Sequence, residues 1–291
     1  GLNPLLQNYW MTIHPPTLFL GFPSVTLPFC YAIAGLWTGE HKAWMKPALP
    51  WSLFSGAILG TGILMGGAWA YEALSFGGYW AWDPVENMSL VPWMVLVAGI
   101  HTHLVARATG HSIRTTYLFY ILSFVLILYS TFLTRSGILG DTSAHAFTEM
   151  GLEWQLVAFI LAFLALGIGW LAYRYKSVPA PQEEEPFESR EFWMFIGSLV
   201  LMLGAVLIPA ATSLPVVNKI VEFFDPTFIG WALEDPEAHH NKFQLWIAFF
   251  IALLSSVSQY LRYKGRGWAS YARRFSTHVA VAAALAFVLS F

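Results

Sequence analysis

Eight long apolar stretches, each mostly free of charged residues, follow one another along the chain. A helix needs roughly 20 consecutive apolar residues to cross a bilayer, so each stretch predicts one membrane-spanning helix. The eighth stretch is too short to be whole, and we expect the chain to be an internal piece of a longer protein. The predicted spans are Thr17–Trp37, Ala48–Tyr71, Met88–Ala106, Ile113–Thr134, Trp154–Tyr173, Phe192–Thr212, Phe243–Leu261 and Phe275–Phe291.

The composition supports this interpretation. Of 291 residues, 57% are apolar and 11% are charged, whereas soluble domains carry roughly 25% charged residues. We therefore predict an all-α fold, a polytopic membrane helix bundle of about eight spans with an outward-facing tryptophan-rich loop. A net charge of −2 leaves no basic field for nucleic acid. The single cysteine, Cys30, excludes a disulfide framework and a cysteine-type zinc site.

Positive charges separate the loops into two classes. When alternate loops are assigned to one side of the membrane, twelve of the fifteen Lys and Arg residues fall together. Cytoplasmic loops carry an excess of Lys and Arg, so that side is predicted to face the cytoplasm and the other side to face outward. The three outer cations are Arg135, Lys219 and Lys242.

This topology divides the chain into three predicted parts. Residues 1–175 form a core of about five spans, and residues 176–190, which contain prolines and a run of glutamates, form a cytoplasmic linker. Residues 191–291 form a C-terminal membrane segment with an outer loop at 213–241. Within that loop, Leu214–Phe224 is predicted to be an interfacial helix of weak amphipathicity.

Glycines recur in the second predicted span. Gly56 with Gly60, and Gly62 with Gly66, each form a small-xxx-small pattern. In a soluble chain such glycines would resemble a phosphate loop, but no Walker lysine follows them here. We therefore expect these residues to permit close packing of helices.

Two histidines lie in predicted spans at similar depth. By the helical rise, His101 lies ~9 Å and His278 ~6 Å from the cytoplasmic ends of their helices. Two imidazoles on different helices can bind one haem iron between them, whereas the alternative is that each makes an interhelical hydrogen bond. His103 competes with His101, but it lies about 200° away around the helix, so only one of the two should be a ligand.

A second pair of histidines lies on the predicted outer side. His14 stands before Pro15 and Pro16, which predict that no helix begins before Pro15, and His145 stands in the loop after the fourth span. These two imidazoles could form a second bis-histidine site, or both could simply be solvated. The remaining histidines that lie beside charges are placed in loops and receive no role: His41, His111, His239 and His240.

The densest cluster of aromatic and polar residues is GGYWAWDPVEN, at Gly77–Asn87. Glycines permit close approach, and indoles offer stacking area and N–H donors to a porphyrin. Asp83 and Glu86 suggest acid–base chemistry, but Asp, Pro and Glu in this order also form a helix-start signature, which we favour. Arg135 is the expected partner of a haem propionate. The expected haem contacts are Gly77, Gly78, Tyr79, Trp80, Trp82, Asp83 and Arg135.

These motifs together resemble a known family. Gly77–Asn87 looks like the tryptophan-rich WWD signature of haem-handling membrane proteins. Leu2–Gln7 leading to Ile13–Pro16, and Arg135–Leu139 leading to His145–Phe147, are similar to CcmF-type subunits of the cytochrome c maturation haem lyase. The resemblance covers most of residues 1–175 and is looser beyond them.

The resemblance implies ligands for two haems. In that family, one periplasmic histidine pair flanks the WWD loop and holds the haem being transferred, and a second pair in the membrane holds a resident haem b. By position, His14 and His145 match the first pair. His101 and His278 match the second.

The implied activity is a haem lyase of the bacterial inner membrane, acting with other cytochrome c maturation subunits. A periplasmic haem chaperone would deliver haem, and the thiols of an apocytochrome c Cys-x-x-Cys-His sequence would add to its vinyl groups, so no side-chain nucleophile is needed. The resident haem would keep the iron reduced, with quinol as a donor. Two alternatives are a quinol oxidoreductase subunit with one bis-histidine haem, and a haem transporter, although no paired broken helices mark a midplane site.

Overall fold

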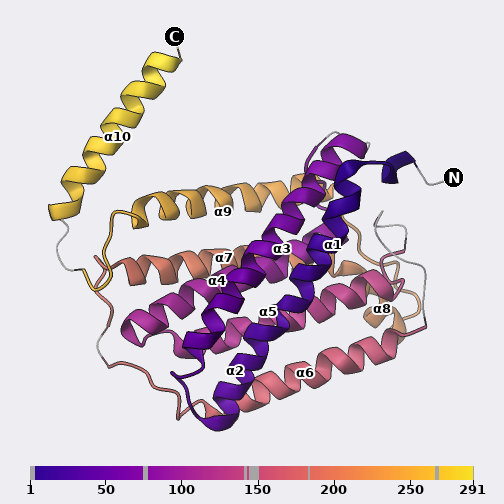
Figure 1. Cartoon of the computed structure of the whole chain (residues 1–291). Coiled ribbons are helices and arrows are strands. Elements are labelled where there is room, and N and C mark those ends of the chain that lie inside the picture. The colour runs from indigo at the N-terminus through magenta and orange to yellow at the C-terminus, as the bar shows by residue number, and fades with distance from the viewer. Residues whose placement is uncertain are drawn as a thin grey trace.

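A computed structural model describes residues 4–74, 78–140, 143, 151–182, 184–265 and 269–290. Every regular element in these residues is helical, and one short 3-10 helix, Pro4–Leu6, precedes the first long helix (Figure 1). The α-helices are α1 (Tyr9–Ser24), α2 (Thr26–Thr38), α3 (Met45–Ala73), α4 (Pro84–Thr109), α5 (Ile113–Arg135), α6 (Glu153–Arg174), α7 (Arg190–Thr212), α8 (Leu214–Phe224), α9 (Pro236–Ser258) and α10 (Ala269–Leu289).

The predicted membrane bundle is confirmed. Eight segments in the described part of the chain are helical, long and apolar enough to cross a membrane, and α1 with α2 counts as one of them. Each segment overlaps a span predicted from the sequence. The division into residues 1–175, 176–190 and 191–291 stays a prediction, as does the membrane-surface position of α8.

Short polar signals set the helix ends. Asp83 caps α4 by accepting from the backbone N–H of Val85, while the Glu86 carboxylate accepts from the backbone N–H of Asp83. Ser189 caps α7 and Asp235 caps α9 in the same way. These oxygens satisfy N–H groups that a helix start leaves without partners. The reciprocal pair at α4 confirms the helix-start interpretation of Asp83 and Glu86.

The expected absence of a helix before Pro15 is wrong. Helix α1 begins at Tyr9 and contains Pro15, Pro16 and Pro23. Proline inside a helix removes a backbone hydrogen bond and disfavours helical geometry in the preceding residue. Two contacts compensate here: the Asn8 side chain accepts from Trp10 N–H, and α1 packs along α3.

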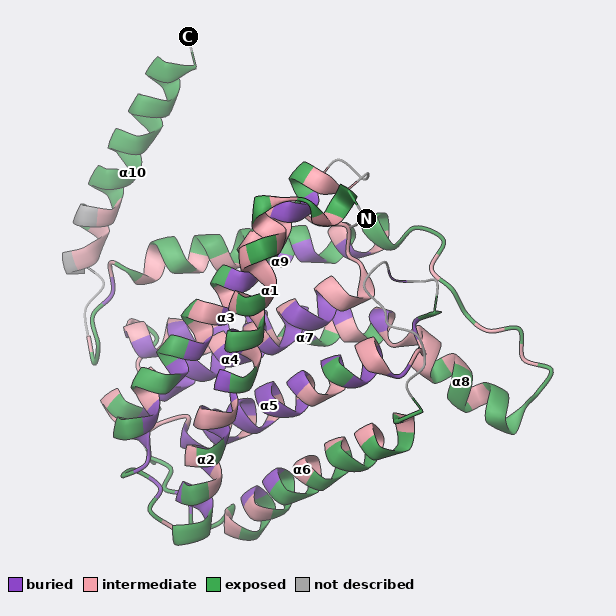
Figure 2. Cartoon of the chain, turned by 45° about the vertical axis from the view of Figure 1, so that its right-hand side comes forward, coloured by how far each residue is buried: buried purple, intermediate pink, exposed green. Residues whose placement is uncertain are grey.

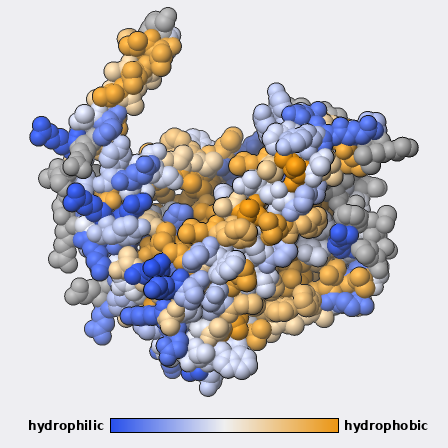
Figure 3. All heavy atoms as spheres, viewed as in Figure 1, coloured by the Kyte–Doolittle hydropathy of each residue, from blue (hydrophilic) through white to orange (hydrophobic). Residues whose placement is uncertain are grey.

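The core lies around α4 and α5, whose side chains are mostly buried (Figure 2). The apolar side chains of α7 pack against those of α4 in one cluster, and those of α2 and α6 pack against α5. Helix α10 is exposed along its length and stands apart from the bundle in both cartoon views. Figure 3 shows hydrophobic residues in a broad belt across the visible face, with hydrophilic residues gathered toward its two ends. This distribution is typical of a membrane bundle.

We expect the stability of the bundle to fall in mild acid because of His41. This side chain is buried in the turn before α3, with Nδ1 3.1 Å from the Tyr117 hydroxyl and Nε2 3.1 Å from the Ser177 hydroxyl. Burial, and secondarily the charge of Arg174, lowers the pKa of His41 below its ordinary value of 6.5. The unfolded chain therefore binds the proton first, and stability is lost as the pH falls below that value.

Thermal unfolding in detergent at pH 7.5 and pH 5 tests this expectation. The wild-type chain should melt at a lower temperature at pH 5, and His41→Asn should lose less on acidification. An unchanged acid effect in His41→Asn would assign the effect to another group.

Candidate functional site

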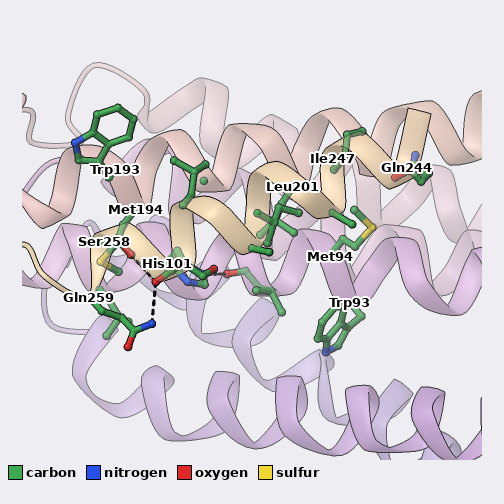
Figure 4. Close-up of a pocket in the computed structure, with 18 of the residues that line it drawn as sticks. Trp93, Met94, His101, Trp193, Met194, Leu201, Gln244, Ile247, Ser258 and Gln259 are labelled. Carbon is green, nitrogen blue, oxygen red and sulfur yellow. Dashed lines mark hydrogen bonds between the residues drawn. The ribbon is translucent and has the colours of Figure 1, made fainter. Parts of the chain in front are cut away.

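An apolar pocket of about 810 Å³ lies between α4, α7 and α9. Its size is within the range of roughly 300–1,000 Å³ that is usual for cofactor sites. Figure 4 shows Trp93, Met94, Gln244 and Ile247 toward one end, and His101 near Ser258 and Gln259 toward the other. The pocket is therefore mostly hydrophobic, with polar groups concentrated around His101.

The side chain of His101 lines this pocket. Its Nδ1 lies 2.8 Å from the backbone carbonyl of Val97, one turn earlier in α4. A carbonyl can only accept, so Nδ1 carries the proton and Nε2 keeps its lone pair. Histidines that bind metals are oriented in this way by a carbonyl partner. Among the described lining residues, His101 is the one histidine.

His103 has a structural environment. Its side chain is fully buried, with Nδ1 2.7 Å from the Tyr120 hydroxyl and Nε2 2.9 Å from the carbonyl of Met45. Both ring nitrogens are therefore engaged, and they link α4 to α5 and to the start of α3. This arrangement favours His101 over His103 as a ligand.

His278 is not brought to the pocket. It lies on the exposed helix α10, where its ring contacts Tyr260 at 5.5 Å between centroids. The described residues that line the pocket do not include it. The pairing of His101 with His278 therefore stays a prediction, and it requires α10 to approach the bundle.

Trp82 connects the aromatic loop to this pocket. It lines the pocket, and its ring lies edge-on to Trp80 at 6.0 Å between centroids. Its backbone has a φ of +56°, which is uncommon for a bulky residue. The Trp82 carbonyl accepts from Asn87, and its indole N–H donates to the Asn241 side chain at 2.9 Å.

His240 completes the environment of Trp82. This histidine is buried, and its ring stacks on Trp82 at 4.9 Å between centroids. Placing His239 and His240 in a loop was wrong, because Asp235 caps the helix well before them and both lie in α9. The sequence signal was Asp235-Pro236-Glu237, a helix-start pattern like that at Asp83, just before the predicted seventh span.

The carboxylates of the loop have structural partners. Besides capping α4, Asp83 accepts from the Ser143 hydroxyl at 2.8 Å. Glu86 accepts from the backbone N–H groups of Ala81 and Asp83. Both carboxylates therefore hold the loop onto the start of α4. The predicted haem contact of Asp83 stays a prediction.

Trp80 offers a free donor. Its indole nitrogen is buried and has no hydrogen-bond acceptor among the described residues. A buried N–H without an acceptor is unfavourable by roughly 1–3 kcal/mol, which a bound acceptor would offset. The neighbouring residue Tyr79 stacks on Tyr71, with 4.4 Å between ring centroids, and the Tyr79 carbonyl lies against Gly67 of α3. Gly78 lies in the bend before Tyr79.

His14 belongs to α1, and its imidazole contacts α3. Its Nδ1 is 2.7 Å from the carbonyl of Gly62, so this nitrogen carries the proton. A Cβ atom placed on Gly66 would lie 2.6 Å from Cε1 of His14. The next residue of α3, Gly67, contacts Tyr79. Two consecutive glycines of α3 therefore lie against His14 and against the edge of the aromatic loop.

The remaining predicted site residues are His145, Gly77 and Arg135. His145 and Gly77 lie outside the described residues. Arg135 lies in the last turn of α5. The pairing of His14 with His145, and the contact of Arg135 with a propionate, stay predictions.

The chain is similar to proteins of one family. Residues 1–139 match the family described as cytochrome C assembly protein. "Cytochrome c-type biogenesis protein CcmF" of Haemophilus influenzae is 37% identical over 242 residues, which are 78% of this chain and 36% of the relative. The protein of the same name from Escherichia coli is 34% identical, over 90% of this chain and 39% of the relative.

A solved structure is also similar. "Cytochrome c Heme Lyase CcmF" superimposes with a TM-score of 0.67 at 30% identity, and the match covers 90% of this chain and 38% of that one. The chain thus spans somewhat more than a third of the length of the relatives that it matches.

Proposed function

Because this chain belongs to the CcmF-type family of cytochrome c assembly proteins, we propose that it is the haem-handling membrane part of a cytochrome c haem lyase. One observation carries the proposal. A pocket of cofactor size that presents the His101 imidazole is joined, through the single side chain of Trp82, to a tryptophan-rich loop. A site for a resident haem and a platform for a transferred haem would then be neighbours.

The residues of the pocket fit a haem b. The walls are apolar, the volume suffices, and His101 would hold the iron through Nε2. His278 is proposed as the second histidine that would hold this iron. When bound, this haem supplies one-electron redox chemistry. The chain's own contribution is to fix the His101 tautomer through Val97 and to exclude water with the apolar walls.

The aromatic loop is proposed to hold the haem that is the substrate. Trp80 and Trp82 would support the porphyrin plane, and His14 and His145 would reach the iron from its two faces. Trp80 N–H and Arg135 are donors for the propionates. Each apocytochrome thiol would add its sulfur and hydrogen across one vinyl group, so the chain needs no nucleophile of its own. Its role is positioning.

The proposal also names a location and partners. The chain would lie in a bacterial inner membrane as a multi-pass protein with the tryptophan loop on the periplasmic side. It would meet an apocytochrome c, a periplasmic haem chaperone and other cytochrome c maturation subunits, with quinol as electron donor. The positive-inside asymmetry of the loops supports this orientation.

Haem spectra of the purified chain test the proposal. We expect two distinguishable haems, and we expect the His14→Ala and His145→Ala variants each to lose the outer haem signal while the inner one remains. One haem that is insensitive to both substitutions would favour a quinol oxidoreductase subunit. No bound haem would favour a transporter.

A further inference from the structure

One cation faces the otherwise apolar pocket. Arg190, the first residue of α7, lines its polar end with Ser258 and Gln259, and its guanidinium lies over the ring of Tyr263 at 5.2 Å. Among the described residues that line the pocket, Arg190 is the one charged side chain, and no carboxylate is present.

Apart from its contact with the Tyr263 ring, the side chain of Arg190 makes no hydrogen bond or ion pair within the described part of the chain. Its Nε is buried without a hydrogen-bond acceptor. The adjacent Glu191 is fully buried, but both of its carboxylate oxygens accept from the backbone N–H of Lys264, at 2.8 and 3.0 Å. The nearest acid in the sequence is thus used to join α7 to the segment after α9, and no ion pair with Arg190 is formed.

The Arg190 side chain is partly buried, and its Nε is shielded from solvent, so a bound anion that accepts from this nitrogen would offset the lost hydration. A planar carboxylate suits the side chain best, because the guanidinium fork can donate two parallel hydrogen bonds. A quinone headgroup is neutral and would leave the charge unpaired. The pocket therefore favours a ligand that is apolar over most of its surface and carries a carboxylate at one edge.

We propose that Arg190 binds a propionate of the inner haem, so that the acidic edge of that haem faces the end of the pocket formed by the start of α7 and the end of α9. This inference rests on the proposed inner haem site. The inference gives the propionates of the two haems different partners. Arg135, which is proposed to bind a propionate of the outer haem, lies in the last turn of α5. By the charge asymmetry of the loops, Arg190 belongs to the cytoplasmic end and Arg135 to the outer end.

The test compares haem with haem dimethyl ester, whose propionates carry no charge. Haem-free chain in detergent is titrated with each compound, and occupancy of the inner site is followed by the signal that His101→Ala loses. Wild type should bind haem about tenfold more tightly than the diester, equivalent to about 1.4 kcal/mol. In Arg190→Gln this ratio should fall to near one. Arg190→Lys, which keeps the positive charge, should retain much of the preference for haem over the diester. If Arg190→Gln is unstable, Arg190→Met takes its place.

The matched control is Arg114→Gln. Arg114 also has a buried Nε without an acceptor and also lies over a tyrosine ring, that of Tyr175 at 4.3 Å, but it does not line the pocket. Its substitution should leave the haem-to-diester ratio at the wild-type value. A second readout is the midpoint potential of the bound haem, which should fall in Arg190→Gln, because loss of a nearby positive charge disfavours the reduced form.

Three results would overturn the inference: equal binding of both compounds by wild type, a wild-type ratio in Arg190→Gln, or an equal loss of preference in Arg114→Gln. His101→Ala separates this failure from failure of the proposed function. If that variant loses the low-spin spectrum while Arg190→Gln keeps the wild-type ratio, only the role of Arg190 is rejected. If His101→Ala binds haem as wild type does, the inner site and the inference both fail.

Discussion

His101→Ala is expected to abolish the low-spin b-type signal of the inner haem in the purified chain. The imidazole is the one histidine that the described residues bring to the pocket, and its Nδ1 contact with Val97 leaves Nε2 as the ligand atom. Without it, none of the described residues that line the pocket offers an imidazole to the iron, so the haem loses one of its two proposed ligands. The measurement is the reduced-minus-oxidised absorption spectrum, together with the haem content per chain.

His103→Gln is the matched control, since it changes a histidine two residues away in the same helix. We expect it to keep the spectrum and to lower thermal stability, because the Tyr120 hydroxyl and the Met45 carbonyl lose a buried partner. An unsatisfied buried group costs about 1–3 kcal/mol. If the spectrum persists in His101→Ala and disappears in His103→Gln, the assignment passes to His103.

Gly66→Ala is expected to impair transfer of haem to apocytochrome severely, although it adds only one methyl group. That group would lie 2.6 Å from Cε1 of His14, and its neighbour Gly67 already contacts the loop at Tyr79. The imidazole, or α1 with it, must therefore shift. A displacement of about 1 Å at a reacting group can lower the rate about 10²-fold. The yield of haem-stained c-type cytochrome in cells measures the effect.

Gly169→Ala serves as the control for helix propensity. Gly169 lies within α6, and a methyl group added there would meet open space, so alanine at this position should be neutral or slightly stabilising. The inner haem spectrum should be retained in both variants, because Gly66 does not line the pocket. If Gly66→Ala gives a normal cytochrome yield, or if Gly169→Ala lowers the yield equally, then the position of His14 against Gly66 does not control haem transfer.

Local features of the fold were predictable from the sequence. The apolar stretches predicted the spans because the bilayer sets helix length independently of partners. The start of α4 was predictable because the capping groups, Asp83 and Glu86, lie within four residues of each other. Helix α8 matched its predicted range, Leu214–Phe224, because Pro215 near its start and Asp225 just after it define its limits.

Features that depend on distant contacts were not predictable. The prolines after His14 indicated a helix start, whereas packing of α1 on α3 stabilises a helix through them. His240 and Asn241 received no role, because their contact with Trp82 spans more than 150 residues of sequence. Arg190 looked like an ordinary cytoplasmic cation, because a pocket shared by three helices leaves no pattern in any one of them.

The position of Trp82 has a thermodynamic consequence. Its indole is at once a wall of the inner pocket, an edge-on neighbour of Trp80, and a hydrogen-bond donor to α9. A ligand that fills the pocket and shifts the Trp82 ring also changes the aromatic surface that Trp80 and Trp82 form in the tryptophan-rich loop. Linkage then requires reciprocity: occupancy of the outer surface must change the affinity of the inner pocket by the same factor. The two haem sites would therefore be coupled in equilibrium binding as well as by electron transfer.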